Sequence, residues 1–425
     1  MMIENRPTKK KIYFWNLLGN LAAAAVSVVY LLIVTRLQPA EVADHYSLAT
    51  SVGNLWVIIG LFQVRNYQST DINQTHSFTA YFSTRLLTIS FMLLTIVPYL
   101  LMIDYDLSIL SLAIVILLIL YRVSDALSDV FQGLFQQVDR LDIAGKSMFY
   151  RYGLSVIILF ASLLITKSIV LALSLVALFN LFFVFFYDYS YSLKIAKINW
   201  YSIFSKDNFL ECMKILELCL PLFFYGFLLT LIFNEPRLVI ASEMKKGILA
   251  EGLQRDYNIL FMPVFFMNLC FMVIRPLITD LAKLWSIKEF KIFDQILLKV
   301  LLVLLGGGLL ITALAYLCGI PVLEMVFGVD LSNYTLTLTL LVFSGILYAI
   351  ATFFENILTI FRKHFYLAIV YIAMFAISKL ITIGQVQSQG LLGAAISFFI
   401  VMLTYVTGNG LMYLFARYRK RMKNE

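Results

Sequence analysis

The sequence predicts an all-α polytopic membrane protein with about 12 transmembrane helices in two six-helix lobes. Hydrophobic residues make up 61% of the 425 residues, charged residues make up 14%, and the mean hydropathy is +0.88. Apolar runs of about 20 residues recur along the chain, which is the length that a helix needs to cross a bilayer. These runs lack the alternation of barrel strands, and lipid offers no partner for backbone polar groups, so helices are expected.

The apolar runs follow one another with short connections. The second and fourth are the least apolar, because Asp44 and His45 fall in the second, and Arg122 and Asp125 fall in the fourth. The predicted spans cover residues 12–35, 43–64, 79–101, 107–131, 147–166, 168–190, 212–234, 257–279, 292–318, 332–357, 364–383 and 391–415.

Lys and Arg set the expected orientation, since they are retained on the cytoplasmic side of bacterial membranes. Basic residues gather in both tails, at 6–11 and 417–423, and an even number of spans places both tails on one side. The connections 102–106 and 319–330 contain no Lys or Arg. We therefore expect a multi-pass protein of the bacterial cytoplasmic membrane with both termini in the cytoplasm. The net charge of +8 then reflects contact with anionic lipids, and no nucleic-acid partner is expected.

Residues suited to enzymatic or metal chemistry are scattered along the chain. The four cysteines show no Cys-x-x-Cys spacing, and the three histidines form no ligand set. No Ser-His-Asp order, His-Glu-x-x-His motif or Gly-rich phosphate loop is present. We therefore expect no enzymatic activity, no cofactor and no metal site.

The longest cytoplasmic connection lies near the middle of the chain. At residues 191–211, Lys194 and Lys197 alternate with apolar residues, which suits either an amphipathic helix in the membrane interface or a basic loop. We expect this linker to separate an N-terminal lobe, 1–190, from a C-terminal lobe with a basic tail, 212–425. Six spans in each lobe give both the same orientation, which is the parallel pseudo-twofold repeat of many alternating-access transporters.

Charged residues inside the predicted spans are the best indicators of a site, because an ionisable group in a bilayer usually faces a partner or a wet cavity. In the fourth span, Arg122, Asp125 and Asp129 are three and four residues apart and fall on one helical face. They either line a cavity or form local ion pairs in a cytoplasmic extension of the helix.

Three other spans contain isolated charges. Arg275 lies near the inner end of the eighth span, where it either meets an anionic headgroup or extends to the interface. Glu217 lies one turn before Pro221, so it belongs either to a coupling hinge or to a packing kink. Lys379 is a lone cation in the otherwise apolar eleventh span.

Four stretches resemble the polysaccharide transporter family of O-antigen, capsule and exopolysaccharide flippases, within the multidrug/oligosaccharidyl-lipid/polysaccharide exporter superfamily. The first contains the Thr35-Arg36 turn, and the third, NEPRLVI, is similar to the family's Asn-x-Pro-Arg-Tyr-x-Ile stretch. The chain departs from the family at Gln38-Pro39, where Gly is usual, and at Leu238, where Tyr is usual. The stretches cover residues 16–49, 64–71 with 131–147, 234–240 and 272–285.

The resemblance implies a flippase that moves undecaprenyl-diphosphate-linked oligosaccharide repeat units to the outer leaflet by alternating access. It also implies a lipid-linked oligosaccharide substrate, surrounding membrane lipids, and a polysaccharide polymerase and other assembly proteins as partners. Arginine suits a diphosphate, because its planar fork binds two oxygens at once. On this hypothesis Arg65, Arg122 and Arg275 capture the diphosphate on the cytoplasmic side. Arg36 and Arg237 guide its release outside.

A cation-coupled drug or metabolite exporter of the same superfamily is the alternative function. It would need buried acidic groups, and the candidates for coupling or gating are Asp125, Asp129 and Glu217, together with the cation Lys379. A third hypothesis is a membrane glycosyltransferase or polymerase. The sequence lacks the large outer loop or cytoplasmic nucleotide-sugar domain that such an enzyme needs.

Overall fold

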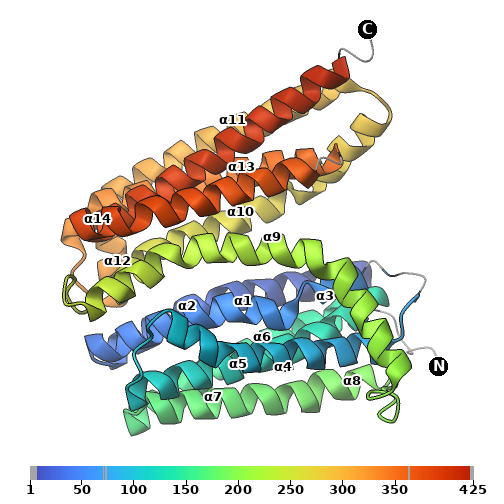
Figure 1. Cartoon of the computed structure of the whole chain (residues 1–425), viewed down its shortest axis with the longest axis horizontal. Coiled ribbons are helices and arrows are strands. Elements are labelled where there is room, and N and C mark those ends of the chain that lie inside the picture. Colours follow the sequence, from blue (N-terminus) through green and yellow to red (C-terminus); the bar gives the residue numbers. More distant parts are fainter. Residues whose placement is uncertain (1–6, 70, 72–73, 362–363, 422–425) are drawn as a thin grey trace. The chain divides into compact units, whose positions relative to one another are not determined.

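Helices form every regular element in the described part of the computed structural model. That part comprises residues 7–69, 71, 74–361 and 364–421, without the side chains of 265–276, 279–280, 364–365 and 418–421. The chain divides into two units, Met1–Thr230 (unit 1) and Leu231–Glu425 (unit 2). Helix α9 begins in unit 1 and ends in unit 2 (Figure 1). We had placed the start of the second lobe at residue 212, before this helix crosses from one unit to the other.

Unit 1 contains the first six spans. The sixth is continued by a π-helical segment, η1, and a last short turn, α8. The helices are α1 (Lys9–Leu37), α2 (Ala40–Leu61), α3 (Val64–Gln68), α4 (Phe78–Met102), α5 (Ile109–Gln137), α6 (Leu141–Thr166), α7 (Ile169–Phe183), η1 (Val184–Tyr189), α8 (Ser190–Ser192) and the first part of α9 (Lys206–Lys245).

Unit 2 contains the remaining spans. Helix α14 holds two of them, because Gly390 has the non-helical angles φ 57° and ψ −129° and divides it. The elements after α9 are α10 (Leu253–Ser286), α11 (Phe290–Leu314), η2 (Ala315–Gly319), α12 (Ile320–Phe327), η3 (Ser332–Tyr334), α13 (Thr335–Ile360) and α14 (His364–Arg421).

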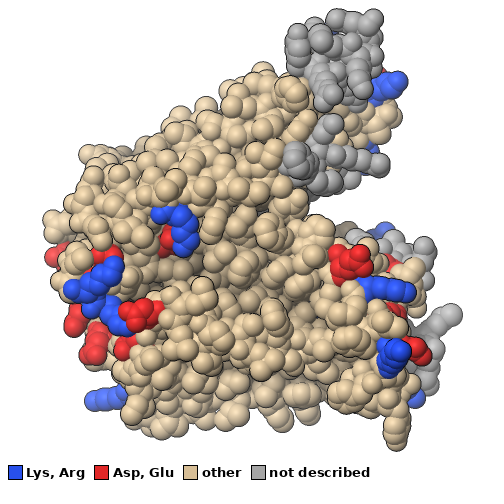
Figure 2. Space-filling view, viewed as in Figure 1, with Lys and Arg blue, Asp and Glu red and all other residues tan. Residues whose placement is uncertain are grey.

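The helices have the length and composition of membrane spans. In the described part of the chain, 10 are long and apolar enough to cross a bilayer. Dividing α14 adds one, and the 34-residue α10 adds another. On the face shown in Figure 2, most charged side chains lie near the margins, where the helices end, and leave an apolar belt between them. The prediction of an all-α membrane protein with about 12 spans is therefore confirmed.

Two connections differ from their predictions. Helix α9 continues to Lys245, so the outer loop predicted at 235–256 is wrong, and most of that segment is helical. Its charges suggested a loop, but they have partners within unit 2, such as the ion pair between Glu235 and Lys379. The linker at 191–211 has turns and irregular backbone over residues 193–205, which favours the basic loop over the amphipathic helix.

Close packing of α1 against α6 depends on two glycines. A Cβ atom added at Gly19 would lie 2.7 Å from the Cα of Gly145, and one added at Gly145 would lie 2.7 Å from the backbone N of Asn16. Because real Cβ contacts essentially never fall below 3.0 Å, an alanine at either position would force the helices apart. Such small residues let helix backbones approach closely where lipid provides no hydrophobic driving force.

We expect Gly145→Ala to lower the free energy of unfolding by about 1–3 kcal/mol, because the added methyl overpacks the contact between α1 and α6. Gly153→Ala on the same helix is the matched control, since no atom lies within 4 Å of its added Cβ. Thermal unfolding in detergent measures both variants. Equal melting temperatures for the two would contradict the proposed packing.

The connection between α3 and α4 is organised by one carboxylate, Asp71. Its oxygens accept hydrogen bonds from the backbone N–H and the hydroxyl of Thr75 at 2.9 and 2.7 Å, and from the Tyr81 hydroxyl at 2.8 Å. The backbone N–H of His76 donates another at 3.1 Å. Burial alone would raise the pKa of Asp71, but these donors outweigh burial and lower the pKa from 3.8 to about 2.

A lowered carboxyl pKa stabilises the folded state above the unfolded-state value, and this contribution is lost as the pH falls through the folded-state value. We therefore expect Asp71→Asn to lower the free energy of unfolding by about 2 kcal/mol at pH 7. The difference from the unmodified protein should be constant down to about pH 4 and shrink toward pH 2. Unfolding curves of both proteins across this range test the prediction, and a difference independent of pH would refute it.

Candidate functional site

Helix α5 carries a polar face through the interior of unit 1. Asp125, Ser128, Asp129, Gln132 and Gln136 recur at spacings of three and four residues, so they lie on one side of the helix. The rest of α5 is apolar and packs against α2, α4 and α7, which fixes the direction of this face. Two carboxylates are thereby held inside a membrane helix bundle, where each needs a cationic partner.

Asp125 is held by two arginines and a tyrosine. Arg151 Nη1, from α6, lies 2.9 Å from Asp125 Oδ1, and Arg122 Nη1, one turn earlier on α5, lies 2.8 Å from Oδ2. The Tyr152 hydroxyl donates to Asp125 Oδ1 at 3.0 Å. The side chain of Arg151 is 0% exposed, whereas that of Arg122 is 16% exposed and also donates to Asn54 on α2.

Asp129 has the same kind of surroundings one turn further along α5. Arg85 Nη2, from α4, lies 2.7 Å from Asp129 Oδ2, and Arg65 Nη1, from α3, lies 3.5 Å from Oδ1. Arg65 also donates to the side-chain oxygen of Gln132 at 2.6 Å. Here too one arginine, Arg85, is 0% exposed and the other, Arg65, is 26% exposed.

Four guanidinium groups therefore surround two carboxylates, and we call these six residues the α5 charge cluster. A fully buried arginine, Arg85 or Arg151, forms the close partner of each aspartate. A partly exposed arginine, Arg65 or Arg122, is the second partner and is the one that can meet a solute. A further carboxylate, Asp188 in η1, is fully buried beside the cluster and accepts a hydrogen bond from Ser128 at 2.6 Å.

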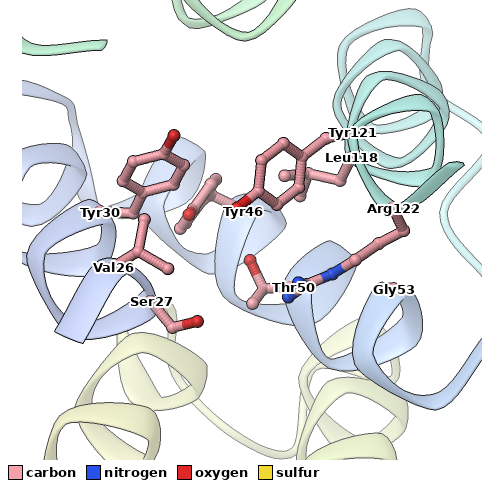
Figure 3. A pocket seen from close by; sticks show the side chains of 9 residues that line it. All are labelled: Val26, Ser27, Tyr30, Tyr46, Thr50, Gly53, Leu118, Tyr121 and Arg122. Carbon is pink, nitrogen blue, oxygen red and sulfur yellow. The ribbon is translucent and has the colours of Figure 1, made fainter. Parts of the chain in front are cut away.

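A small pocket adjoins Arg122 between α1, α2 and α5 (Figure 3). Tyr30, Tyr46 and Tyr121 surround it, and the side chain of Arg122 extends from α5 toward Thr50 on α2. The space left between the side chains is about 10 Å³, which is close to the volume that admits one water molecule.

In unit 2 the structure places two other predicted residues. Arg237 is buried on α9, donates to Asn258 at 2.6 Å and to the carbonyl of Phe233 at 2.8 Å, and lies 4.2 Å from the ring centroid of Phe261. Lys379 Nζ on α14 lies 2.6 Å from Glu235 Oε2 on α9. Lys379 is therefore paired with a buried carboxylate.

The structure brings together four of the nine residues predicted from the sequence as a site, namely Arg65, Arg122, Asp125 and Asp129. Arg36 has an exposed side chain in the last turn of α1, and Glu217 is exposed on α9, so neither belongs to the α5 charge cluster. The side chain of Arg275 lies outside the described residues.

The sequence analysis missed Arg85 and Arg151, which lie inside the predicted spans 79–101 and 147–166. An arginine within an apolar span is itself a signal of a buried partner, and this signal was available in the sequence. Among the described residues, no three His, Cys, Asp or Glu side chains gather as metal ligands.

No protein-family model matches the chain, and no curated protein matches it. Solved structures of multidrug and toxic compound extrusion (MATE) transporters do share its fold. An inward-facing multidrug resistance MATE transporter of the MOP superfamily superposes with a TM-score of 0.67 at 12% identity, over 98% of this chain and 96% of that chain.

Two further structures agree with this fold. A MATE transporter in complex with MaL6 gives a TM-score of 0.61 at 14% identity, over 98% of this chain and 96% of that chain. The Vibrio cholerae MATE transporter VcmN gives 0.60 at 13% identity, over 98% and 97%. The chain therefore has the fold of MATE transporters of the MOP superfamily, which is the superfamily that the sequence stretches resemble.

Proposed function

We propose that this protein is a flippase that moves undecaprenyl-diphosphate-linked oligosaccharide units from the inner to the outer leaflet of the bacterial cytoplasmic membrane, by alternating access. The observation that carries the proposal is the excess of arginine in the α5 charge cluster, where four guanidinium groups face two carboxylates. A site for a cationic drug would require the opposite balance. An anionic substrate fits the surplus of positive charge.

The diphosphate is the part of the substrate that such a site would recognise. Its oxygens suit the planar fork of arginine, and the polyprenyl tail can stay in the lipid while the headgroup crosses. Arg65 and Arg122 are the candidates for capture, because they are partly exposed and each aspartate retains a fully buried arginine if its partner moves away.

The remaining predicted roles belong to the same proposal. Arg275 assists capture on the cytoplasmic side, whereas Arg36 and Arg237 guide release outside. The lobes 1–190 and 212–425 alternate around the substrate, with both termini in the cytoplasm. Asp125 and Asp129 act in gating through their arginine partners, and Glu217 and Lys379 are further candidates for coupling. A polysaccharide polymerase would receive the translocated unit.

Deletion of the gene in its native host tests this function. The amounts of undecaprenyl-diphosphate oligosaccharide in each leaflet and of surface polysaccharide would be measured with and without the intact gene. We expect complete units to accumulate on the inner face, with the surface polymer lost and then restored by complementation. Complete but unpolymerised units on the outer face would point to a polymerase instead, and an unchanged polymer would refute the proposal.

A cation-coupled drug or metabolite exporter is a second candidate, and Glu355 in unit 2 favours it. Its Oε2 accepts hydrogen bonds from the Tyr371 hydroxyl at 3.0 Å and from the Tyr405 hydroxyl. Among the described side chains, no Lys or Arg forms an ion pair with it. A carboxyl in such surroundings can exchange a proton during transport.

Ethidium efflux driven by an imposed proton gradient in everted vesicles would test this second function. We expect Glu355→Gln to abolish efflux if the protein is a proton-coupled exporter, while Glu324→Gln in a connection of unit 2 should leave efflux intact. No efflux by the unmodified protein, with polysaccharide export dependent on it, would exclude this candidate.

A further inference from the structure

The pocket beside Arg122 contains more hydrogen-bond donors than its surroundings use. Within the described part of the chain, the hydroxyls of Tyr30, Thr50 and Tyr121 are buried and have no hydrogen-bond partner. The Tyr30 and Tyr121 side chains are only 3% and 4% exposed. A buried hydroxyl without a partner costs about 1–3 kcal/mol, so a pocket that leaves three of them unsatisfied is suited to a ligand that accepts hydrogen bonds.

The guanidinium of Arg122 gives this pocket its sign. Its Cζ lies 5.2 Å from the centroid of the Tyr121 ring, and the two residues line the same space as Tyr30 and Thr50 (Figure 3). Gly53 borders the side chain, and the Cβ of any other residue there would lie 3.7 Å from Arg122 Cγ. Phenolic and alcoholic O–H groups next to a guanidinium favour an oxyanion.

The size of the pocket limits what can enter. About 10 Å³ between the side chains admits one water-sized group, so a single phosphoryl oxygen fits while a whole headgroup does not. Arg122 is meanwhile bound to Asp125 at 2.8 Å and to Asn54. An entering phosphate would compete with Asp125 for Arg122.

Release of Arg122 would leave Asp125 paired. Arg151 Nη1 lies 2.9 Å from the same carboxylate, and the Tyr152 hydroxyl donates to it at 3.0 Å. A buried charge that keeps a fully buried partner avoids the large cost of isolation. The geometry therefore provides two alternative partners for Arg122, namely Asp125 on its own helix and an anion in the pocket.

We infer that Tyr30, Thr50, Tyr121 and Arg122 form a subsite for one phosphoryl oxygen of a polyprenyl diphosphate, and that Asp125 regulates this subsite by competing for Arg122. The inference rests on the proposed flippase function and adds the residues that bind the headgroup and the exchange that controls them. Binding of the headgroup breaks the link between Arg122 and Asp125 and so couples substrate occupancy to the packing of α2, α5 and α6.

Equilibrium binding of farnesyl diphosphate to the purified full-length protein in nanodiscs tests the inference. Farnesol and inorganic pyrophosphate serve as comparison ligands that separate recognition of the lipid from recognition of the phosphate. We expect Tyr30→Phe and Tyr121→Phe each to weaken binding of farnesyl diphosphate about tenfold, because each removes one hydrogen bond to a charged group and keeps the ring. Farnesol binding should not change.

Asp125→Asn should act in the opposite direction and strengthen the binding of farnesyl diphosphate several-fold, because it frees Arg122. Tyr46→Phe is the matched control, since Tyr46 lines the same pocket but its hydroxyl is not among the unpartnered ones. The tyrosine variants keep the test decisive if Asp125→Asn fails to fold, which size-exclusion chromatography would reveal.

The outcomes separate the two proposals. Tight farnesyl diphosphate binding that is unchanged in Tyr30→Phe and Tyr121→Phe would overturn the subsite and leave the flippase function standing. An unmodified protein that binds farnesyl diphosphate no better than farnesol would overturn both. Inorganic pyrophosphate binding with the same dependence on the tyrosines would support the phosphoryl site and show that the lipid tail contributes little.

Discussion

Replacing Arg122 by Gln is expected to reduce polysaccharide export by about 10- to 100-fold while the protein remains folded. The guanidinium is the only group of its pocket with a full positive charge, and a charge-assisted bidentate contact to phosphate has no equivalent in glutamine. Folding should survive, because Asp125 keeps Arg151 at 2.9 Å and the Tyr152 hydroxyl at 3.0 Å.

Complementation of the deletion strain measures this effect as surface polymer per amount of protein in the membrane. Arg122→Lys should retain part of the activity, because the charge remains and the fork is lost. Arg417→Gln is the matched control, since that arginine is also partly exposed and pairs with Asp294 at 2.8 Å on the surface of unit 2. Full activity in Arg122→Gln would remove Arg122 from the capture of substrate.

The aspartates of α5 could be found from the sequence because helical periodicity is local. Spacings of three and four residues place Asp125 and Asp129 on one face of any helix, whatever surrounds it. The sequence left open whether this face lines an interior or forms local ion pairs, and the structure combines the two. Arg122 pairs within α5, while Arg85 and Arg151 come from other helices.

The partners of these aspartates could not be derived from periodicity, because they depend on which helices pack against α5. Asp129 meets Arg85 from α4 and Arg65 from the short helix α3, which follows two residues with left-handed backbone, Phe62 and Gln63. Nothing in the sequence fixes such a turn. The segment 235–256 failed for a related reason, since its charges read as exposed until Lys379 supplies a partner for Glu235.

Arg85→Met is expected to lower the free energy of unfolding by about 3–5 kcal/mol, which is the usual cost of leaving a buried charge without its partner. Arg85 is 0% exposed and lies 2.7 Å from Asp129, whereas Arg65 lies 3.5 Å from it and cannot replace that contact. The Gly60 carbonyl, which Arg85 also contacts, keeps a hydrogen bond from the Thr88 hydroxyl at 2.7 Å. The predicted loss therefore comes from the isolated aspartate.

A second substitution separates the charge effect from a packing effect. If the isolated carboxylate causes the loss, Arg85→Met combined with Asp129→Leu should recover most of the stability, because an apolar pair can replace a buried ion pair at little cost. Arg65→Gln should lower stability by about 1 kcal/mol or less, since that arginine is partly exposed and makes the longer contact. Unfolding in detergent, measured for both single variants and the double variant, gives the coupling energy. A double variant as unstable as Arg85→Met would show that Arg85 stabilises unit 1 by packing, and Asp129 would then not need a permanently buried cation.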